Sequence, residues 1–152
     1  MEDKERRQII LHKEIDLIQD CIKRMAHNSF LIKGWTVSLI AVVLALAKDK
    51  IDFFYICLIL LIPVLGFWYL DAFFLRTEKK FRKMYKWVIT NRMKRDDNMY
   101  DVDPNQYNDE VESLLSVMFS KTLKVFFGIP FLILFTIIIY HLVKIIFCNH
   151  LI

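Results

Sequence analysis

Residues 101 to 112 carry acidic and amide side chains at a spacing that resembles a calcium-binding loop, in which oxygen ligands alternate along the chain around a central glycine. The residues in this frame are Asp101, Asp103, Asn105, Tyr107, Asp109 and Glu112. Gln106 stands in place of the glycine, and Pro104 interrupts the loop. A helix start explains the segment more simply, with Asp103 as the N-cap and Pro104 as the first helical residue. We therefore expect no metal and no cofactor, and a helix from about 104 to 127.

Asp71 is the second candidate for chemistry, because it directly follows a long apolar run. A carboxylate at the edge of a membrane span is costly unless it is paired or hydrated. Lys33 and Arg76 should lie at the same interface and are candidate partners. Two roles remain open: a polar contact in a pore or between subunits, and a salt bridge that fixes the register of two helices.

Catalytic motifs are missing from the sequence. It has no Ser/His/Asp set, phosphate-binding loop, HExxH motif or glycine-rich nucleotide fingerprint. Its three cysteines, Cys21, Cys57 and Cys148, form no CxxC pair. His141 lies inside an apolar run, where a neutral, hydrogen-bonded imidazole is the simplest interpretation. We predict that the protein is not an enzyme.

Hydrophobic and charged residues occupy different parts of the chain. Of the 152 residues, 56% are hydrophobic and 25% are charged. A membrane-spanning helix needs about 20 mostly apolar residues, and residues 53–75 and 125–147 meet this requirement directly. Residues 30–47 reach spanning length if the Lys33 side chain extends toward the headgroups, and an interfacial or bundle-buried helix is the alternative for this segment. The scarcity of glycine and proline excludes an all-β fold. The sequence predicts an all-α integral membrane protein with three transmembrane helices, the first two of which form a hairpin over residues 29–75.

Basic residues predict the orientation of these spans. Of the 21 lysines and arginines, seven precede the apolar core of the first span, which begins at Gly34, and eleven lie between the second and the third spans. Since positive loops stay in the cytoplasm, residues 1–28 and 76–124 are expected to form a cytoplasmic helical bundle. The tail 148–152 is then external.

Two cytoplasmic helices are expected beside the spans. Residues 1–28 form an amphipathic helix, and its apolar seam has the spacing of a coiled coil: Leu11, Ile15, Ile18, Ile22 and Met25. Whether the seam packs within the chain or between chains is left open. The second helix continues from the second span through residues 76–95, and its basic residues are expected to contact anionic lipid headgroups. A helix so close to the membrane leaves little room for a nucleic acid duplex.

Two stretches carry a family resemblance: residues 24–35, Arg-Met-Ala-His-Asn-Ser-Phe-Leu-Ile-Lys-Gly-Trp, and residues 67–76, Phe-Trp-Tyr-Leu-Asp-Ala-Phe-Phe-Leu-Arg. Over residues 20–90 the chain resembles the RipA family of octameric membrane proteins, a group of small bacterial multi-span proteins. The resemblance implies an inner-membrane location and a homo-oligomer, with an eight-membered ring as the expected form. It also implies a common role at the cytoplasmic interface for a polar collar: Asn28, Ser29, Lys33, Gly34, Trp35, Asp71 and Arg76.

Two functions compete at this level. The first is a homo-oligomeric pore or membrane-acting effector, whose lumen would be lined by the first span through Thr36 and Ser38. The second is a non-conducting scaffold or adaptor that binds a cytosolic protein through its helical head. The number of subunits, the activating signal and the partner cannot be derived from the sequence.

Overall fold

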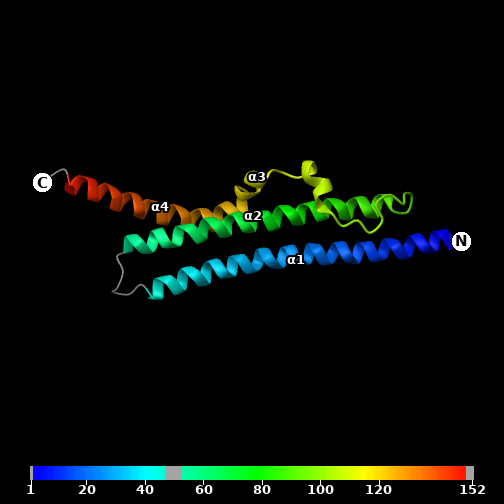
Figure 1. Ribbon diagram of the computed structural model, residues 1–152, viewed down its shortest axis with the longest axis horizontal. Coiled ribbons are helices and arrows are strands. Elements are labelled where there is room, and N and C mark those ends of the chain that lie inside the picture. The colour runs from blue at the N-terminus through cyan, green and yellow to red at the C-terminus, as the bar shows by residue number, and fades with distance from the viewer. Residues whose placement is uncertain (1, 47–52, 150–152) are drawn as a thin grey trace.

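The computed structural model describes residues 2–46 and 53–149, and within these ranges the chain is helical without strands. Its elements are α1 (Glu2–Leu46), α2 (Phe53–Asn91), the 3-10 helix η1 (Pro104–Glu110), α3 (Leu114–Met118) and α4 (Lys121–Asn149), shown in Figure 1. The all-α prediction is confirmed. The predicted turn over residues 48–52 lies outside the described residues, as does the end of the predicted tail, 150–152.

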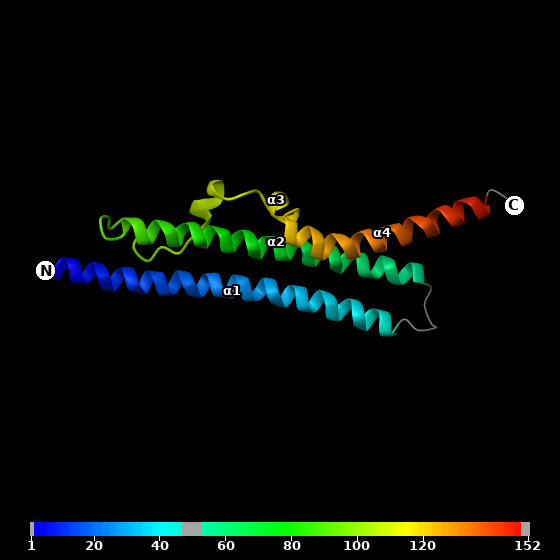
Figure 2. The ribbon, with the colours of Figure 1, turned by 180° about the vertical axis from the view of Figure 1, so that it is seen from behind.

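Helix α2 is the centre of the fold. Helix α1 runs antiparallel along one side of it, while η1, α3 and α4 lie along the other side, as the two opposite views show (Figures 1 and 2). Helices α1 and α4 both contact α2 but form no contact interface with each other in the described part of the chain. The three long helices therefore form an open layer rather than a closed bundle.

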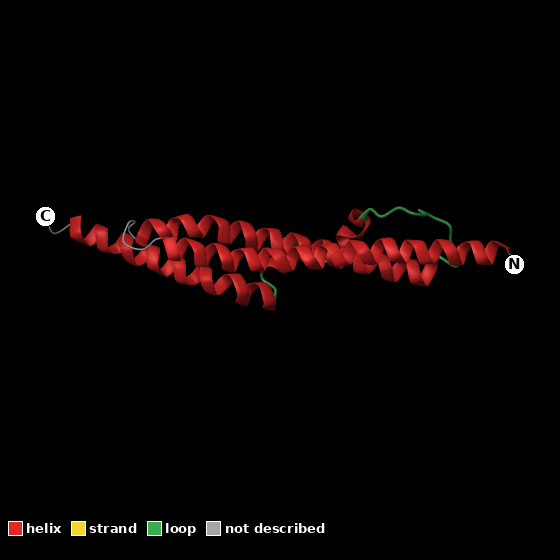
Figure 3. Cartoon of the chain, turned by 90° about the horizontal axis from the view of Figure 1, so that it is seen from below, coloured by secondary structure: helices red, strands yellow, loops and turns green. Residues whose placement is uncertain are grey.

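Three helices are long and apolar enough to cross a membrane: Asp3–Ala45, Phe54–Asn91 and Lys121–Ile146. Their most apolar windows are 17%, 39% and 17% buried, which identifies α2 as the shielded helix of the three. We call residues 30–46, 53–70 and 125–146 the apolar half of the molecule, and residues 2–29 and 71–124 the charged half. The helices run nearly parallel to the long axis, so the two halves lie end to end (Figure 3).

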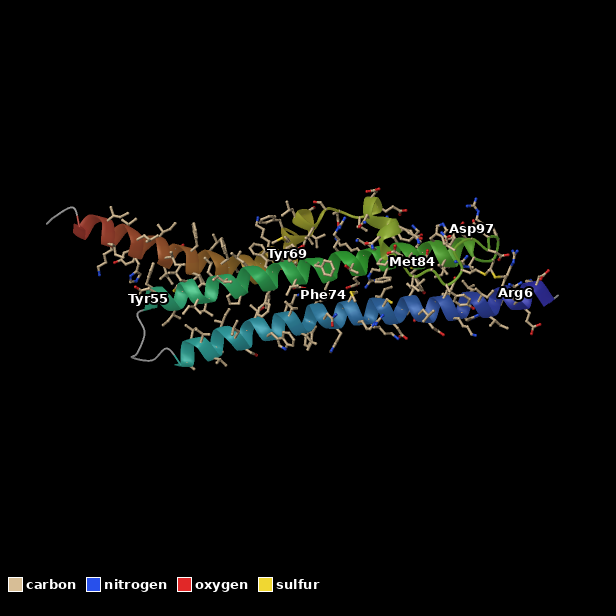
Figure 4. All side chains as sticks on the ribbon, in the orientation of Figure 1. Arg6, Tyr55, Tyr69, Phe74, Met84 and Asp97 are labelled. Carbon is tan, nitrogen blue, oxygen red and sulfur yellow. The ribbon has the colours of Figure 1, made fainter. Side chains whose placement is uncertain are left out.

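Helix α1 packs on α2 through the predicted seam. Ile18 is buried with Phe81, Met84 and Val88 of α2, and the other four seam residues pack around this cluster. Figure 4 shows Met84 near the middle of the charged half, with Arg6 and Asp97 at its far end. The seam is therefore used within the chain, and its burial contributes to the α1–α2 hairpin rather than to a contact with another molecule.

A second apolar cluster joins the four α-helices where the two halves meet. Its buried residues are Ile32, Trp68, Ala72, Val117, Leu123 and Phe127. Trp68 of α2 stacks on Phe127 of α4 at 6.2 Å between ring centroids, and its indole N–H donates to the Met118 carbonyl at 2.8 Å. Aromatic pairing and the paired N–H together fix the start of α4 against α2.

The prediction of one helix from 104 to 127 is wrong. Asp103 does cap a helix and Pro104 begins it, but this helix is the 3-10 helix η1, and it ends at Glu110. Ser113 then caps the short α3 by accepting from the Ser116 N–H. A continuous α-helix would use the Asn108 and Glu112 carbonyls internally, whereas here they accept from the Arg76 guanidinium. Tertiary hydrogen bonds to α2 thus replace helical ones.

Candidate functional site

A buried network around Asp71 joins α1 to α2 at the boundary between the two halves. Ser29 Oγ donates to Asp71 Oδ1 at 2.5 Å, and Lys33 Nζ donates to Ser29 Oγ at 2.8 Å. Lys33 Nζ also lies 2.5 Å from Asp71 Oδ2, as an ion pair without hydrogen-bond alignment. We call these three residues the Asp71 network.

Burial makes the Asp71 network strong. The Asp71 side chain is 0% exposed and that of Lys33 is 24% exposed, so the carboxylate depends on its partners while the ammonium keeps some access to the surface. A desolvated carboxylate without partners would be strongly unfavourable. The contact fixes the register of α1 on α2, which corresponds to the structural role considered for Asp71.

The remaining collar residues do not join this network. Arg76 points to the opposite side of α2, where it donates to the Glu112 carbonyl at 2.9 Å and the Asn108 carbonyl at 3.3 Å. Gly34 and Trp35 lie on the exposed face of α1, and Asn28 is half-buried. The structure therefore divides the predicted collar into a buried network, an exposed face and a separate link to residues 108–112.

The two predicted lumen residues lie on different faces of α1. Thr36 is only 2% exposed, and its hydroxyl donates to the Ile32 carbonyl at 2.7 Å. Because α2 is the helix that packs along α1 in the described chain, the buried Thr36 faces that interface. Ser38 is exposed on the outer face. Of the two, only Ser38 is placed to face a path between chains.

A second buried network lies at the far end of the charged half. Arg92, the residue that follows the end of α2, is 2% exposed, and its Nε donates to Glu14 Oε2 of α1 at 2.5 Å. The same guanidinium donates to the Asp97 carbonyl at 2.6 Å and the Asn98 carbonyl at 3.3 Å. Glu14 Oε1 in turn accepts from the Tyr100 N–H at 2.7 Å. We call this group the Arg92 network.

The Arg92 network holds a strained loop. Asn98 and Tyr100 adopt left-handed backbone conformations, with φ of 50° and 60°. Such a conformation is uncommon for non-glycine residues and persists only where the surroundings enforce it. The bonds from Arg92 to the Asn98 carbonyl and from Tyr100 to Glu14 supply that constraint. Arg7 adds a link from α1 to the Met93 carbonyl and to Asp96.

Ion pairs attach residues 104–113 to the basic part of α2. Lys79 pairs with Glu112, and Lys83 lies 3.8 Å from Glu110. The hydrogen bond from Lys79, aided by its charge, holds the pKa of Glu112 below its ordinary value. Burial lowers the pKa of Lys80, and the neighbouring Arg76 charge adds to this shift. Several basic residues of α2 therefore have internal partners, and Lys80 of α2 and Arg92 just after its end are buried away from any headgroup.

No family model matches the chain. Curated proteins and solved structures likewise show no significant similarity to it. The resemblance to the RipA family therefore stays a prediction, and a function has to be inferred from the geometry.

The Lys79–Glu112 pair leads to a prediction about pH. A carboxyl group whose pKa is lower in the folded than in the unfolded protein stabilises the fold at pH values above its unfolded pKa. This contribution is lost as the pH falls through its folded pKa. We expect the carboxyl resonance of Glu112 to titrate below 4.5, its ordinary value. In Lys79→Met the midpoint should return toward that value. An unchanged midpoint in Lys79→Met would show that the pair does not form in solution.

Sequence reasoning missed the Arg92 network. Arg92 is among the basic residues predicted from the sequence to contact lipid headgroups, and the sequence prediction does not single out Glu14. One signal was available: Glu14 stands four residues from both Ile10 and Ile18, which are buried on the same stripe of α1. A lone acid on an apolar stripe indicates a buried pair, although the stripe does not identify its partner.

Proposed function

We propose that the chain is a homo-oligomeric protein of the bacterial inner membrane that acts on the membrane as a helical assembly. In this proposal the apolar half spans the bilayer three times, and the charged half, with the N-terminus, lies in the cytoplasm. Support comes from the three apolar helices, from the basic residues that flank them and from the end-to-end separation of the two halves.

The open layer of helices is the observation that favours an oligomer. Helix α2 is covered on both sides, but α1 and α4 each expose a full face along the apolar half. The exposed face of α1 carries small residues, on which membrane helices pack closely: Gly34, Ser38, Ala41 and Ala45. Packing α1 of one chain on α4 of the next would repeat head to tail and close into a ring.

A pore through such a ring would be narrow or gated. Among the exposed residues of the apolar half, hydroxyl groups are carried by Ser38, Thr136 and three tyrosines, Tyr55, Tyr69 and Tyr140, and the Thr136 hydroxyl already donates to the Leu132 carbonyl. The exposed faces are otherwise strongly apolar, so conduction would require an apolar gate to open. The alternative function is a non-conducting scaffold. It would have to bind its cytosolic partner through a surface other than the predicted seam, because α2 covers the seam.

Cysteine cross-linking tests the proposed contact between chains. Ser38 lies in the apolar part of α1 and Ile133 in that of α4, and both are exposed. We expect chains carrying Ser38→Cys, with the native cysteines replaced by alanine, to form a disulfide with chains carrying Ile133→Cys. The two chains would carry different tags and be oxidised together in membranes.

Thr36→Cys is the matched control, since it lies two residues from Ser38 but is buried against α2. Chains carrying Thr36→Cys should form no disulfide with chains carrying Ile133→Cys. Equal cross-linking from positions 36 and 38 would indicate random collision. The absence of cross-links from Ser38→Cys would contradict a contact between α1 and α4.

A further inference from the structure

A groove on the outer side of α4 is not used by either buried network. It has a volume of about 570 Å³ and lies between the start of α4 and Trp68 of α2. Its walls include Phe119, Gly128 and Leu132, and two lysines line it at the end nearest the charged half: Lys121 and Lys124. Most of this lining is apolar, so the charges are confined to one end.

The two lysines at this end are free to bind an anion. Both are exposed, and neither forms an ion pair within the described residues, whereas Lys33, Lys79 and Lys83 all pair with carboxylates. Lys121 is also the first residue of α4, where the helix dipole is positive. Positive charge therefore gathers at the level where the apolar half begins.

The dimensions of the groove match one leaflet of a bilayer. From Lys121 to Leu132 the lining follows one face of α4 over eleven residues, which is roughly 16 Å at the rise of an α-helix. The hydrocarbon core of a bilayer is about 30 Å thick, so this length is close to half of it. A groove with a basic end and an apolar floor of one-leaflet depth has the shape of a phospholipid.

The groove is formed before anything binds. Trp68 is fixed by its hydrogen bond to the Met118 carbonyl and by stacking on Phe127. Gly128 contributes no side chain, and a Cβ there would come within 4.0 Å of the Trp68 ring. A preformed site loses less conformational entropy on binding than a flexible one.

We propose that this groove binds one anionic phospholipid from the leaflet next to the charged half. Lys121 and Lys124 hold its phosphate, and an acyl chain lies against Trp68 and along α4. The inference rests on the membrane insertion proposed above. It differs from general headgroup contact with the basic part of α2, because one lipid occupies one defined site.

Fluorescence quenching tests the proposal. Trp35→Phe and Trp87→Phe leave Trp68 as the single tryptophan of a three-tryptophan chain. This variant is reconstituted in vesicles that contain either phosphatidylglycerol or phosphatidylcholine with brominated acyl chains. We expect brominated phosphatidylglycerol to quench Trp68 with an apparent affinity roughly tenfold higher, because each nearby lysine favours an anionic lipid.

Variants test the charge of the two lysines and the shape of the groove separately. In Lys121→Gln/Lys124→Gln the preference for phosphatidylglycerol should vanish while quenching by phosphatidylcholine remains. Gly128→Leu should reduce quenching by both lipids. Lys144→Gln, an exposed lysine at the other end of α4, is the control and should change neither.

Each remaining outcome would overturn the proposal. Equal quenching by both lipids in the unmodified groove would show an unselective lipid-facing surface. No quenching by either lipid, in protein that resists carbonate extraction from the vesicles, would show that protein covers the groove, as a second copy of the chain would do. Protein released by carbonate would instead contradict the proposed membrane insertion itself.

Discussion

Replacing Arg92 with alanine is expected to lower the free energy of unfolding by about 3–5 kcal/mol, the usual effect of breaking a buried ion pair from one side. The change leaves Glu14 buried without its cation, and it removes the donors to the Asp97 and Asn98 carbonyls. Residues 93–103 should then detach from α1. Chemical unfolding in mild detergent measures the loss, and hydrogen exchange at the Tyr100 amide should show the detachment directly.

Lys86→Ala is the matched control for Arg92, since Lys86 is an exposed cation on α2, near Arg92 in sequence. It should change stability by less than about 0.5 kcal/mol. Arg92→Lys should recover only part of the loss, because an ammonium cannot reproduce the several directed bonds of a guanidinium. Equal stability of Arg92→Ala and Lys86→Ala would contradict the Arg92 network.

Replacing Asp71 with leucine is the second change with a large expected effect. It should lower the free energy of unfolding by about 3 kcal/mol. It leaves the ammonium of Lys33 and the hydroxyl of Ser29 without their shared acceptor at the boundary between the two halves. This loss of stability should lie near the lower end of the range for breaking a buried ion pair, because Lys33 is partly exposed and can turn toward the surface. Unfolding in detergent, followed by helical circular dichroism, gives the magnitude.

A double-mutant cycle separates the pair from the general effect of the substitution. Adding Lys33→Met to Asp71→Leu should recover much of the lost stability, since the uncompensated charge is then gone. Arg76→Gln should not couple to Asp71→Leu, because Arg76 contacts residues 108–112 instead. Additive losses for Asp71 and Lys33 would contradict their contact.

The helical layout could be predicted from the sequence, because uninterrupted apolar and amphipathic runs determine it. The long α1 and the continuation of the second span to Asn91 follow from such runs. The order of packing could not be predicted in the same way. That α2 lies between α1 and α4 depends on which faces fit together, as the stacking of Trp68 on Phe127 illustrates.

The polar sites were predictable only in part. Asp71 stood out because a carboxylate beside an apolar run requires a partner, and Lys33 lay at the expected depth. Arg76 is also basic and is much nearer to Asp71 in sequence, yet it binds two backbone carbonyls that no sequence pattern marks as unpaired. Glu14 and Arg92 are 78 residues apart, and such a distant contact leaves no local pattern.

The internal ion pairs bear on the choice between effector and scaffold. In the charged half, the Arg92 network and the Lys79–Glu112 pair use charged side chains for contacts within the chain. Its apolar seam is covered by α2. Most exposed large apolar side chains of the described residues lie instead in the apolar half, on α1, α2 and α4. Assembly within the membrane is therefore favoured over recruitment of a protein by the seam.

The protein mass in mild detergent, measured by light scattering with the detergent contribution subtracted, tests the proposed assembly most directly. We predict one discrete species whose mass is a multiple of the 18.3 kDa chain, with eight copies as the expected number from the family resemblance. Ser38→Leu, which enlarges the small-residue face, should shift that species toward smaller masses. A monomer of 18.3 kDa under all mild conditions would contradict the homo-oligomer.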